Sequence, residues 1–318
     1  MKILITGIHG FVGSNLVEAL KQRHEIYGLD IVAPEKEGVI KTYSWDELDN
    51  GLVPDVEAVI HLAGKAHDTK NKSAADVYFK VNTDLTKKIF DYFSGHPSIK
   101  KFIFFSSVKA AVDKVPGDVL TEDVTPCPVG PYGESKVRAE EYIQQCLNDE
   151  QAIYSGRDVV ILRPCMIHGP GNKGNLNLLY GFVKKNLPWP LGAFENHRTF
   201  TSVDNLTFVI SGLLDKSVES GIYNMADDEA LSTNELIEVM CAAMGKKAHV
   251  WRISKGFIRM AAGMGDVLHL PLNTFRLTKL TENYVVSNAK IKRALGISAM
   301  PVDARDGLTR TIKSFQNQ

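Results

Sequence analysis

Short apolar runs alternate with helical patterns along the first half of the chain. Five of these runs are rich in branched and aromatic residues and are bounded by polar residues or glycine, as buried strands are. They cover residues 2–6, 25–30, 56–63, 100–107 and 157–164. Between them, residues 13–23, 82–93 and 133–147 have helical spacing. Strands alternating with helices predict right-handed crossovers and an α/β fold with a doubly wound parallel sheet.

After residue 165 the pattern becomes irregular. Turns rich in proline and glycine occupy residues 168–175 and 187–192, and helices are predicted over 232–245 and 303–315. A strand near 221–226 is expected to return to the sheet. We therefore predict an α/β domain over residues 1–165. Residues 166–318 are expected to form a smaller α+β portion that is interleaved with it. In such sheets the ligand crevice lies at the carboxyl ends of the strands.

Composition narrows the class of protein. The 318 residues include 37 lysines and arginines and 37 acidic residues, so the net charge is 37 − 37 = 0. This balance argues against nucleic-acid or membrane partners, although a local basic patch remains open. No apolar run approaches the roughly 20 residues of a membrane span. The four cysteines show neither paired nor metal-type spacing. These features predict a cytoplasmic protein without a metal.

A glycine-rich loop follows the first predicted strand. Gly7, Gly10 and Gly13 have GxxGxxG spacing and open a helix, where free backbone N–H groups can hold a pyrophosphate. Asp30 ends the second strand, 20 residues after Gly10, where a carboxylate binds the ribose 2′-hydroxyl and disfavours a 2′-phosphate. Together they predict that residues 1–165 form a Rossmann-type NAD-binding domain; the alternative is a turn with an unrelated aspartate. His9 contacts a phosphate or only lines the loop.

Tyr132 and Lys136 are four residues apart on one face of the helix predicted over 133–147. A free tyrosine has a pKa of about 10, so it needs nearby positive charge to act as a base. Lys136 and a nicotinamide cation are expected to lower that pKa. Ser107, at the end of the preceding strand, is expected to add a second hydroxyl. The alternative is a surface tyrosine beside a solvated lysine, with Ser107 as a polar strand end.

These motifs together resemble the extended short-chain dehydrogenase/reductase family, in its nucleotide-sugar epimerase/dehydratase branch. The resemblance extends over nearly the full length and is carried by GIHGFVG, VIHLAG, VNT, FFSSV, PYGESK, ILRPCMIHGPG and RTFTSVDN. It implies that Ser107, Tyr132 and Lys136 are catalytic. It also implies a set of residues along NAD: Gly7, Gly10, Phe11, Val12, Gly13, Asp30, Leu62, Ala63, Asn82, Tyr132, Lys136 and Pro164.

The same resemblance implies that residues 166–318 mainly bind the substrate. Arg198 matches the arginine that this family places on the diphosphate of a nucleotide sugar, and Arg276 fits a second one. Asn175 matches a third polar contact. The alternatives are surface ion pairs for the arginines and a loop cap for Asn175. Asp204 is expected to cap the helix that follows it.

Two departures from the family pattern bear on the reaction. His168 replaces the usual tyrosine, and is either a substrate contact or a tolerated loop residue. Dehydratases carry an Asp-Glu pair after the catalytic hydroxyl, whereas this chain has Val108, Lys109 and Ala110. The absence of that carboxylate pair argues against a dehydratase.

The favoured function is an NAD-dependent nucleotide-sugar 4-epimerase, acting on a UDP-hexose or UDP-N-acetylhexosamine. The alternative is an NAD(P)H-dependent reductase of a UDP-4-keto-6-deoxy-hexosamine, and a third hypothesis is a non-enzymatic dinucleotide sensor. By resemblance we also expect a homodimer built on the helices around 82–93 and 133–147. Their apolar residues Ile89, Phe93, Tyr142 and Ile143 serve that interface or pack onto the sheet.

Overall fold

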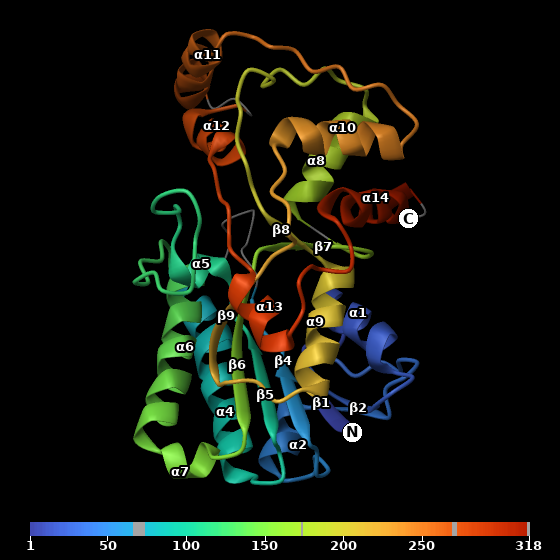
Figure 1. Cartoon of the computed structure of the whole chain (residues 1–318), viewed down its shortest axis with the longest axis vertical. Coiled ribbons are helices and arrows are strands. Elements are labelled where there is room, and N and C mark those ends of the chain that lie inside the picture. The colour runs from blue at the N-terminus through green and yellow to red at the C-terminus, as the bar shows by residue number, and fades with distance from the viewer. Residues whose placement is uncertain (66–73, 173, 269–271, 317–318) are drawn as a thin grey trace.

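A seven-stranded parallel sheet is the centre of the molecule (Figure 1). The computed structural model describes residues 1–65, 74–172, 174–268 and 272–316. Its strand order is β3-β2-β1-β4-β5-β6-β9. The strands are β1 (Lys2–Thr6), β2 (Glu25–Leu29), β3 (Lys41–Tyr43), β4 (Ala58–His61), β5 (Lys101–Phe105), β6 (Asp158–Pro164) and β9 (Gly221–Met225). The predicted Rossmann-type α/β fold is confirmed.

Helices cover both faces of the sheet, because neighbouring strand residues point to opposite sides. On β1, Ile3 and Ile5 face α1 (Phe11–Leu20) and α9 (Val203–Asp215). Leu4 faces the other side, where α4 (Leu85–Gly95) and α6 (Pro131–Asp149) pack. All three side chains are fully buried. The strands therefore read as continuous apolar runs.

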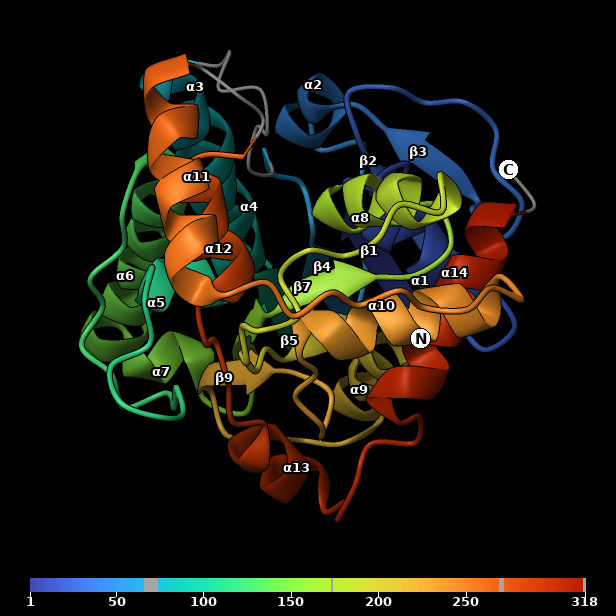
Figure 2. The same cartoon turned by 90° about the horizontal axis from the view of Figure 1, so that it is seen from above.

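The second portion lies over the carboxyl ends of the strands (Figures 1 and 2). A two-stranded parallel sheet of β7 (Met166–His168) and β8 (Phe200–Ser202) leads into it. Its own apolar core joins α8 (Asn175–Lys184), α10 (Thr233–Ala243), α11 (Lys255–Leu268), α12 (Thr274–Thr281) and α14 (Ala304–Gln316). Helix α13 (Ala289–Leu295) packs against β9.

Short helices complete the chain and explain some differences from the sequence pattern. They are α2 (Trp45–Asp49), α3 (Ala75–Tyr78), α5 (Val108–Ala111) and α7 (Gln151–Tyr154). A π-helical stretch, η1 (Phe79–Asp84), precedes α4, so α4 begins at Leu85 rather than residue 82. The edge strand β3 was not predicted from the sequence. Helix α10 begins at a capping box made by Ser232 and Glu235, which explains its sharp start.

The apolar residues considered for a dimer interface belong to the core of the single chain. Ile89, Phe93 and Ile143 are fully buried, and Tyr142 packs against the same cluster on the α4–α6 side of the sheet. These residues therefore pack onto the sheet, which was the second of the two expectations. Among the described residues, none of the helices is long and apolar enough to cross a bilayer.

Candidate active site

The glycine loop between β1 and α1 leaves no space for side chains. Gly7 has φ of +67°, and a Cβ there would lie 2.9 Å from the backbone nitrogen of Ala63. A Cβ on Gly13 would lie 2.5 Å from the carbonyl oxygen of Gly7. Gly10 precedes α1, and no side chain caps this helix start. The backbone N–H groups of the first turn, including those of Phe11 and Val12, are therefore suited to bind a pyrophosphate.

Asp30 lies beside this loop at the end of β2. One carboxylate oxygen accepts the backbone N–H of His9 at 3.0 Å, and the other accepts that of Ile31 at 2.7 Å. The Nε2 atom of His9 lies 3.1 Å from Oγ1 of Thr42 on β3, and burial lowers the pKa of the imidazole. His9 thus ties the loop to the sheet edge, as the lining interpretation expected. The carboxylate of Asp30 is held in one orientation at the predicted ribose position.

The two predicted catalytic hydroxyls meet at the carboxyl end of β5. Ser107 caps the short helix α5 and forms a hydrogen bond with the side chain of Tyr132, in the first turn of α6. Gly133 makes this approach possible, because a Cβ there would lie 2.5 Å from the carbonyl oxygen of Lys109 on α5. The chain thus brings together two hydroxyls that are distant in sequence.

The pKa of Tyr132 is raised from its ordinary value, because burial outweighs the hydrogen bond from Ser107. The predicted lowering by Lys136 together with a nicotinamide cation stays a prediction for the enzyme with NAD bound. In the protein without NAD, the Nζ atom of Lys136 donates to the carbonyl oxygen of Phe105 at 2.8 Å. Burial lowers the pKa of Lys136 to about 8. Further positive charge is therefore needed beside Tyr132 before its phenolate forms at neutral pH.

A buried ion pair lies one helical turn beyond Lys136. Glu140 on α6 accepts hydrogen bonds from Nε and Nη2 of Arg163 on β6, at 2.9 and 2.5 Å. The hydroxyl of Ser106 also donates to Glu140. Both charged side chains are almost fully buried, at 1% and 0% exposure. The carboxylate charge raises the pKa of Lys136 against the effect of burial, so this pair supports the lysine cation.

Asn82 clamps three segments together. Its Oδ1 atom accepts the backbone N–H of Lys65 at 2.7 Å, and its Nδ2 atom donates to the hydroxyl of Ser135 at 3.0 Å. A Cβ on Gly64 would lie 3.0 Å from Oδ1 of Asn82 and 3.1 Å from Nζ of Lys136. The loop after β4, the π-helical stretch and α6 therefore converge at one point. Asn82 is fully buried here.

A one-way chain of hydrogen bonds runs beneath Leu62 and Ala63. The backbone N–H of Ala63 donates to Thr6, whose hydroxyl lies 2.7 Å from Nδ1 of His61. The ring Nε2 lies 2.9 Å from the hydroxyl of Thr86, which donates to the carbonyl of Asn82. The hydroxyl of Thr86 donates its hydrogen to the carbonyl of Asn82, so it can only accept from His61. His61 must therefore donate through Nε2 and accept through Nδ1. Burial and the charge of Lys136 hold the pKa of His61 well below its ordinary value, so the ring stays neutral.

Pro164 is buried at the carboxyl end of β6. Its neighbour Cys165 donates its backbone N–H to the carbonyl of Met225 on β9. Pro164 also pairs with Met225 in the sheet, so the end of β6 is joined to β9 at this point.

Two arginines were predicted to bind the diphosphate of the substrate. Arg276 belongs to α12, and Arg198 forms a hydrogen bond with that helix. An Nη1 hydrogen of Arg198 goes to the carbonyl oxygen of Lys279 at 2.9 Å. Arg276 is an exposed residue of α12, three positions before Lys279. The structure thus relates the two predicted phosphate arginines to one helix. Asn175 is the first residue of α8, and its side chain lies outside the described residues.

A charged cluster joins α12 to the loop between α5 and α6. Asp113 accepts hydrogen bonds from Nζ of Lys109 at 3.2 Å and of Lys279 at 2.9 Å. The Lys109 ammonium also lies 4.3 Å from the ring centre of Tyr284. Lys109, which stands where dehydratases carry a carboxylate, is therefore bound to Asp113.

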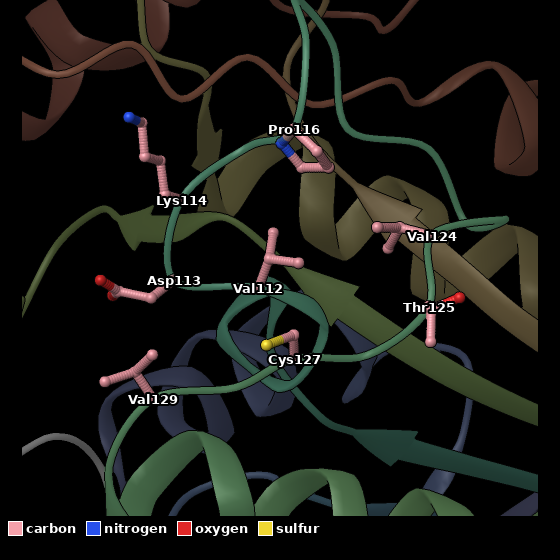
Figure 3. A pocket seen from close by; sticks show the side chains of 8 residues that line it. All are labelled: Val112, Asp113, Lys114, Pro116, Val124, Thr125, Cys127 and Val129. Atoms are coloured by element: carbon pink, nitrogen blue, oxygen red, sulfur yellow. The ribbon is translucent and has the colours of Figure 1, made fainter.

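The same loop contains an open pocket of about 410 Å³. Its lining residues come from the two limbs of the loop (Figure 3). They are Val112, Asp113, Lys114, Pro116, Val124, Thr125, Cys127 and Val129. The pocket includes neither Ser107 nor Tyr132, so the hydroxyl pair marks the candidate site better than this hollow does.

The structure shows the contacts of His168, whose role the sequence left open, and of Asp204, which was predicted to cap a helix. His168 is 2% exposed, with Nδ1 2.9 Å from the hydroxyl of Thr311 on α14 and Nε2 3.7 Å from Asp227. It fastens the closing helix to β7. The expectation that Asp204 caps α9 is wrong, because Ser202 is the cap and Asp204 pairs with Arg310.

The residues that support the site, Glu140, Arg163 and His61, were not predicted from the sequence. Glu140 could have been found, because it continues the four-residue spacing of Tyr132 and Lys136 along one helix face. Arg163 and His61 gave no such signal. Their partners lie on other elements, and only the folded sheet brings them together.

Comparison with known proteins identifies the family. Residues 3–226 match the NAD dependent epimerase/dehydratase family. A UDP-glucose 4-epimerase of Vibrio cholerae is 32% identical over 270 residues, which cover 77% of this chain and 76% of the relative. This chain therefore belongs to the NAD dependent epimerase/dehydratase family, and it is an enzyme that uses NAD.

A second relative covers more of the chain. The N-acetyl-alpha-D-glucosaminyl-diphospho-ditrans,octacis-undecaprenol 4-epimerase of Escherichia coli O157:H7 is 26% identical over 298 residues, which cover 92% of this chain and 84% of the relative. Among solved structures, the UDP-glucuronic acid 4-epimerase of Bacillus cereus in complex with NAD has a TM-score of 0.75 at 21% identity. That alignment covers 100% of this chain and 99% of the other, and it supports the fold.

Proposed function

We propose that the chain is a 4-epimerase of a hexose joined to a diphosphate, with a UDP-hexose or UDP-N-acetylhexosamine as substrate. The observation that carries the proposal is the hydrogen-bonded pair of Ser107 and Tyr132 at the carboxyl end of β5. Lys136 follows on the same helix. Val108 and Lys109 stand where a 4,6-dehydratase needs carboxylates, and that composition favours chemistry at C4 alone.

The loop of Gly7, Gly10 and Gly13 fits a dinucleotide, because a side chain at Gly7 or Gly13 would collide with nearby backbone and the start of α1 has no side-chain cap. Asp30 would hold the adenosine ribose, and Lys136 the nicotinamide ribose. When bound, NAD accepts and returns a hydride and, in its oxidised form, adds positive charge near Tyr132.

In the proposed mechanism, Tyr132 removes the proton from the 4-hydroxyl of the sugar as a phenolate. Ser107 donates a hydrogen bond to the same oxygen and so holds the sugar in place. Lys136 stabilises the phenolate by its charge. After the 4-keto sugar has turned in the site, Tyr132 returns the proton to the oxygen, and the configuration at C4 is inverted.

Arg198 and Arg276 are proposed to hold the diphosphate while the sugar turns. A guanidinium binds phosphate oxygens through a planar pair of N–H groups. The substrates named for the two relatives share a hexose joined to a diphosphate, and differ in what lies beyond the second phosphate. The arginines address the shared part.

The first test is the cofactor released from freshly purified, denatured protein. An epimerase recycles its nicotinamide, so we expect close to one NAD per chain and interconversion of UDP-hexoses with no cofactor added. A largely empty protein that binds NADH from solution would contradict the epimerase and favour the 4-keto reductase. Release of NADP would contradict the role of Asp30. A chain that binds NAD but converts none of the sugar diphosphates would favour the sensor.

A further inference from the structure

Helix α11 carries large apolar side chains on its outer surface. Five of them are more than half exposed: Phe257 at 56%, Met260 at 60%, Met264 at 56%, Val267 at 77% and Leu268 at 60%. Isolated apolar residues on a surface are normal, but a contiguous group on one helix marks an interaction surface.

The spacing of these residues places them along one stripe. At about 100° per residue, Phe257, Met260, Met264 and Leu268 fall within an arc of about 80°. The residues that α11 buries against the molecule are Ile258, Ala262 and Gly265. They lie on a different side of the helix. The stripe therefore faces outward because the inner face is already packed.

The segment around α11 is strongly basic. Residues 246–281 contain seven lysines and arginines and a single acid, Asp266, a local charge of 7 − 1 = +6 in a chain whose net charge is zero. Lys247, Arg252, Lys255 and Arg259 are exposed. Lys255 and Arg259 lie on the side of α11 away from the stripe. An amphipathic helix with an apolar stripe on one face and basic residues on another is typical of segments that lie in the surface of an anionic bilayer.

Helix α12, which packs against α11, also exposes an apolar side chain. Asp266, in the last turn of α11, accepts the backbone N–H of Thr274 at 3.1 Å and so joins the two helices. Phe275, the next residue of α12, is 69% exposed. Figures 1 and 2 show α11 and α12 side by side, in the part of the molecule that lies over the strand ends.

Helix α12 also leads to the substrate side. The carbonyl of Lys279 receives the hydrogen bond from Arg198, and Arg276 lies on the same helix. The exposed stripe and the proposed diphosphate arginines therefore belong to one packed unit. If the stripe lay against another surface, the proposed sugar diphosphate site would therefore lie close to that surface.

We propose that the α11 stripe seats the enzyme on an anionic lipid bilayer, where it also converts a sugar diphosphate carried by a polyprenyl lipid. The inference rests on the proposed function for the reaction, and adds a second class of substrate. The zero net charge gave no reason to expect a membrane partner, but the charge of residues 246–281 is local. The occupant is a lipid surface rather than a second copy of the chain, because two copies would bring two basic segments together.

The test uses the full-length protein and vesicles of phosphatidylglycerol and phosphatidylcholine in equal parts. The stripe variant combines Phe257→Gln, Met260→Gln and Met264→Gln, which keep good helix formers at exposed positions. The matched control combines Ile40→Gln, Leu52→Gln and Ile153→Gln, whose exposures of 57%, 58% and 46% are similar. Co-sedimentation is measured at low and high salt, without any sugar substrate.

We expect the wild-type protein and the control to bind these vesicles, and the stripe variant to bind roughly tenfold more weakly or worse. Binding should weaken with added salt and with vesicles of phosphatidylcholine alone. Equal binding by all three proteins, or no binding by the wild type at low salt, would overturn the proposal. So would a dimer of the wild type that the stripe variant converts to a monomer without any vesicle binding.

The substrate class is tested with polyprenyl diphosphate N-acetylglucosamine in the same vesicles. The stripe variant should turn it over at least about tenfold more slowly than the control, with unchanged turnover of a UDP-hexose in solution. Equal turnover of the lipid-linked sugar by both variants would refute this part. If the proposed 4-epimerase function were wrong, neither substrate would be converted by the wild type or by either variant. Vesicle binding by the wild type and the control would still be observed.

Discussion

Glu140 on α6 binds the guanidinium of Arg163 on β6 through both of its carboxylate oxygens, at 2.9 and 2.5 Å, and both side chains are almost fully buried. Removing one partner of such a pair leaves an uncompensated buried charge. Glu140→Gln should therefore lower the free energy of unfolding by about 3–5 kcal/mol. Urea denaturation followed by circular dichroism measures this change.

A matched control for Glu140 is the exposed pair of Arg310 and Asp204, whose side chains are 59% and 43% exposed. Exposed pairs of this kind contribute about 1 kcal/mol or less, so Asp204→Asn should hardly change the unfolding curve. Similar curves for both variants would show that the Glu140–Arg163 pair does not carry the stability assigned to it.

Lys136 is expected to destabilise the fold that it serves. Its pKa is lowered from 10.5 to about 8, so the unfolded chain holds the proton more tightly than the folded one. The cost is fully present below about pH 8, fades as pH rises toward 10.5 and is absent above. At about 1.4 kcal/mol per pKa unit, Lys136→Met should raise the free energy of unfolding by at most about 3 kcal/mol at pH 7, less the lost bond to Phe105. Unfolding curves at pH 7 and pH 10 check this, and an equal gain at both would contradict it.

Tyr132→Phe removes the hydroxyl that the proposed mechanism uses for proton transfer. Turnover should fall roughly 10²–10⁴-fold. Retained NAD should stay close to the wild-type amount, because the cradle at Gly7 to Gly13 is untouched. The control is Tyr142→Phe on the same helix, whose hydroxyl bonds Asp91 on the outer surface. If Tyr132→Phe epimerised as fast as this control, the proposed base would be wrong.

Arg198→Lys keeps the charge but loses the planar fork of N–H groups. The KM for the sugar diphosphate should rise about 10- to 100-fold, since a hydrogen bond to a charged group contributes about 1.5–3 kcal/mol. Initial rates over a range of UDP-hexose concentrations measure it, with Arg310→Lys as the surface control. An unchanged KM would assign Arg198 to structure alone, through its bond to Lys279.

Asp30→Ser should change the choice between the two dinucleotides. Without the carboxylate, the 2′-phosphate of NADP(H) no longer meets a negative charge, and NAD(H) loses its ribose acceptor. We expect the affinity ratio of NADH to NADPH to fall at least about tenfold, measured by fluorescence titration of cofactor-depleted protein. Asp30→Glu keeps the charge and serves as the control. A serine variant with the wild-type ratio would remove Asp30 from the ribose site.

Most of the main sheet could be predicted, because parallel strands buried on both faces are continuous apolar runs. The exception, β3, contains only Lys41, Thr42 and Tyr43, and two of these are polar or charged. It becomes a strand because the edge of β2 is available for pairing. Its sequence has too little periodicity of its own to reveal it.

The site was predictable where local spacing expresses its chemistry, as for Tyr132 and Lys136 on one helix face. The bond from Lys136 to Phe105 and the raised pKa of Tyr132 depend on burial, which spacing does not report. His168 illustrates the same limit. A histidine in a loop motif left open a substrate contact or a tolerated loop residue, and the fold places Thr311 from the last helix against its ring.

The distribution of charge along the chain has a consequence for how the molecule moves. Residues 246–281 carry +6, so the remaining residues carry −6, and the zero total conceals an electric dipole between the α11 region and the rest. In the field of a negatively charged surface such a molecule experiences a torque before it touches anything, within about one Debye length. Rotation would then precede contact, and the fraction of productive collisions would fall as salt is added.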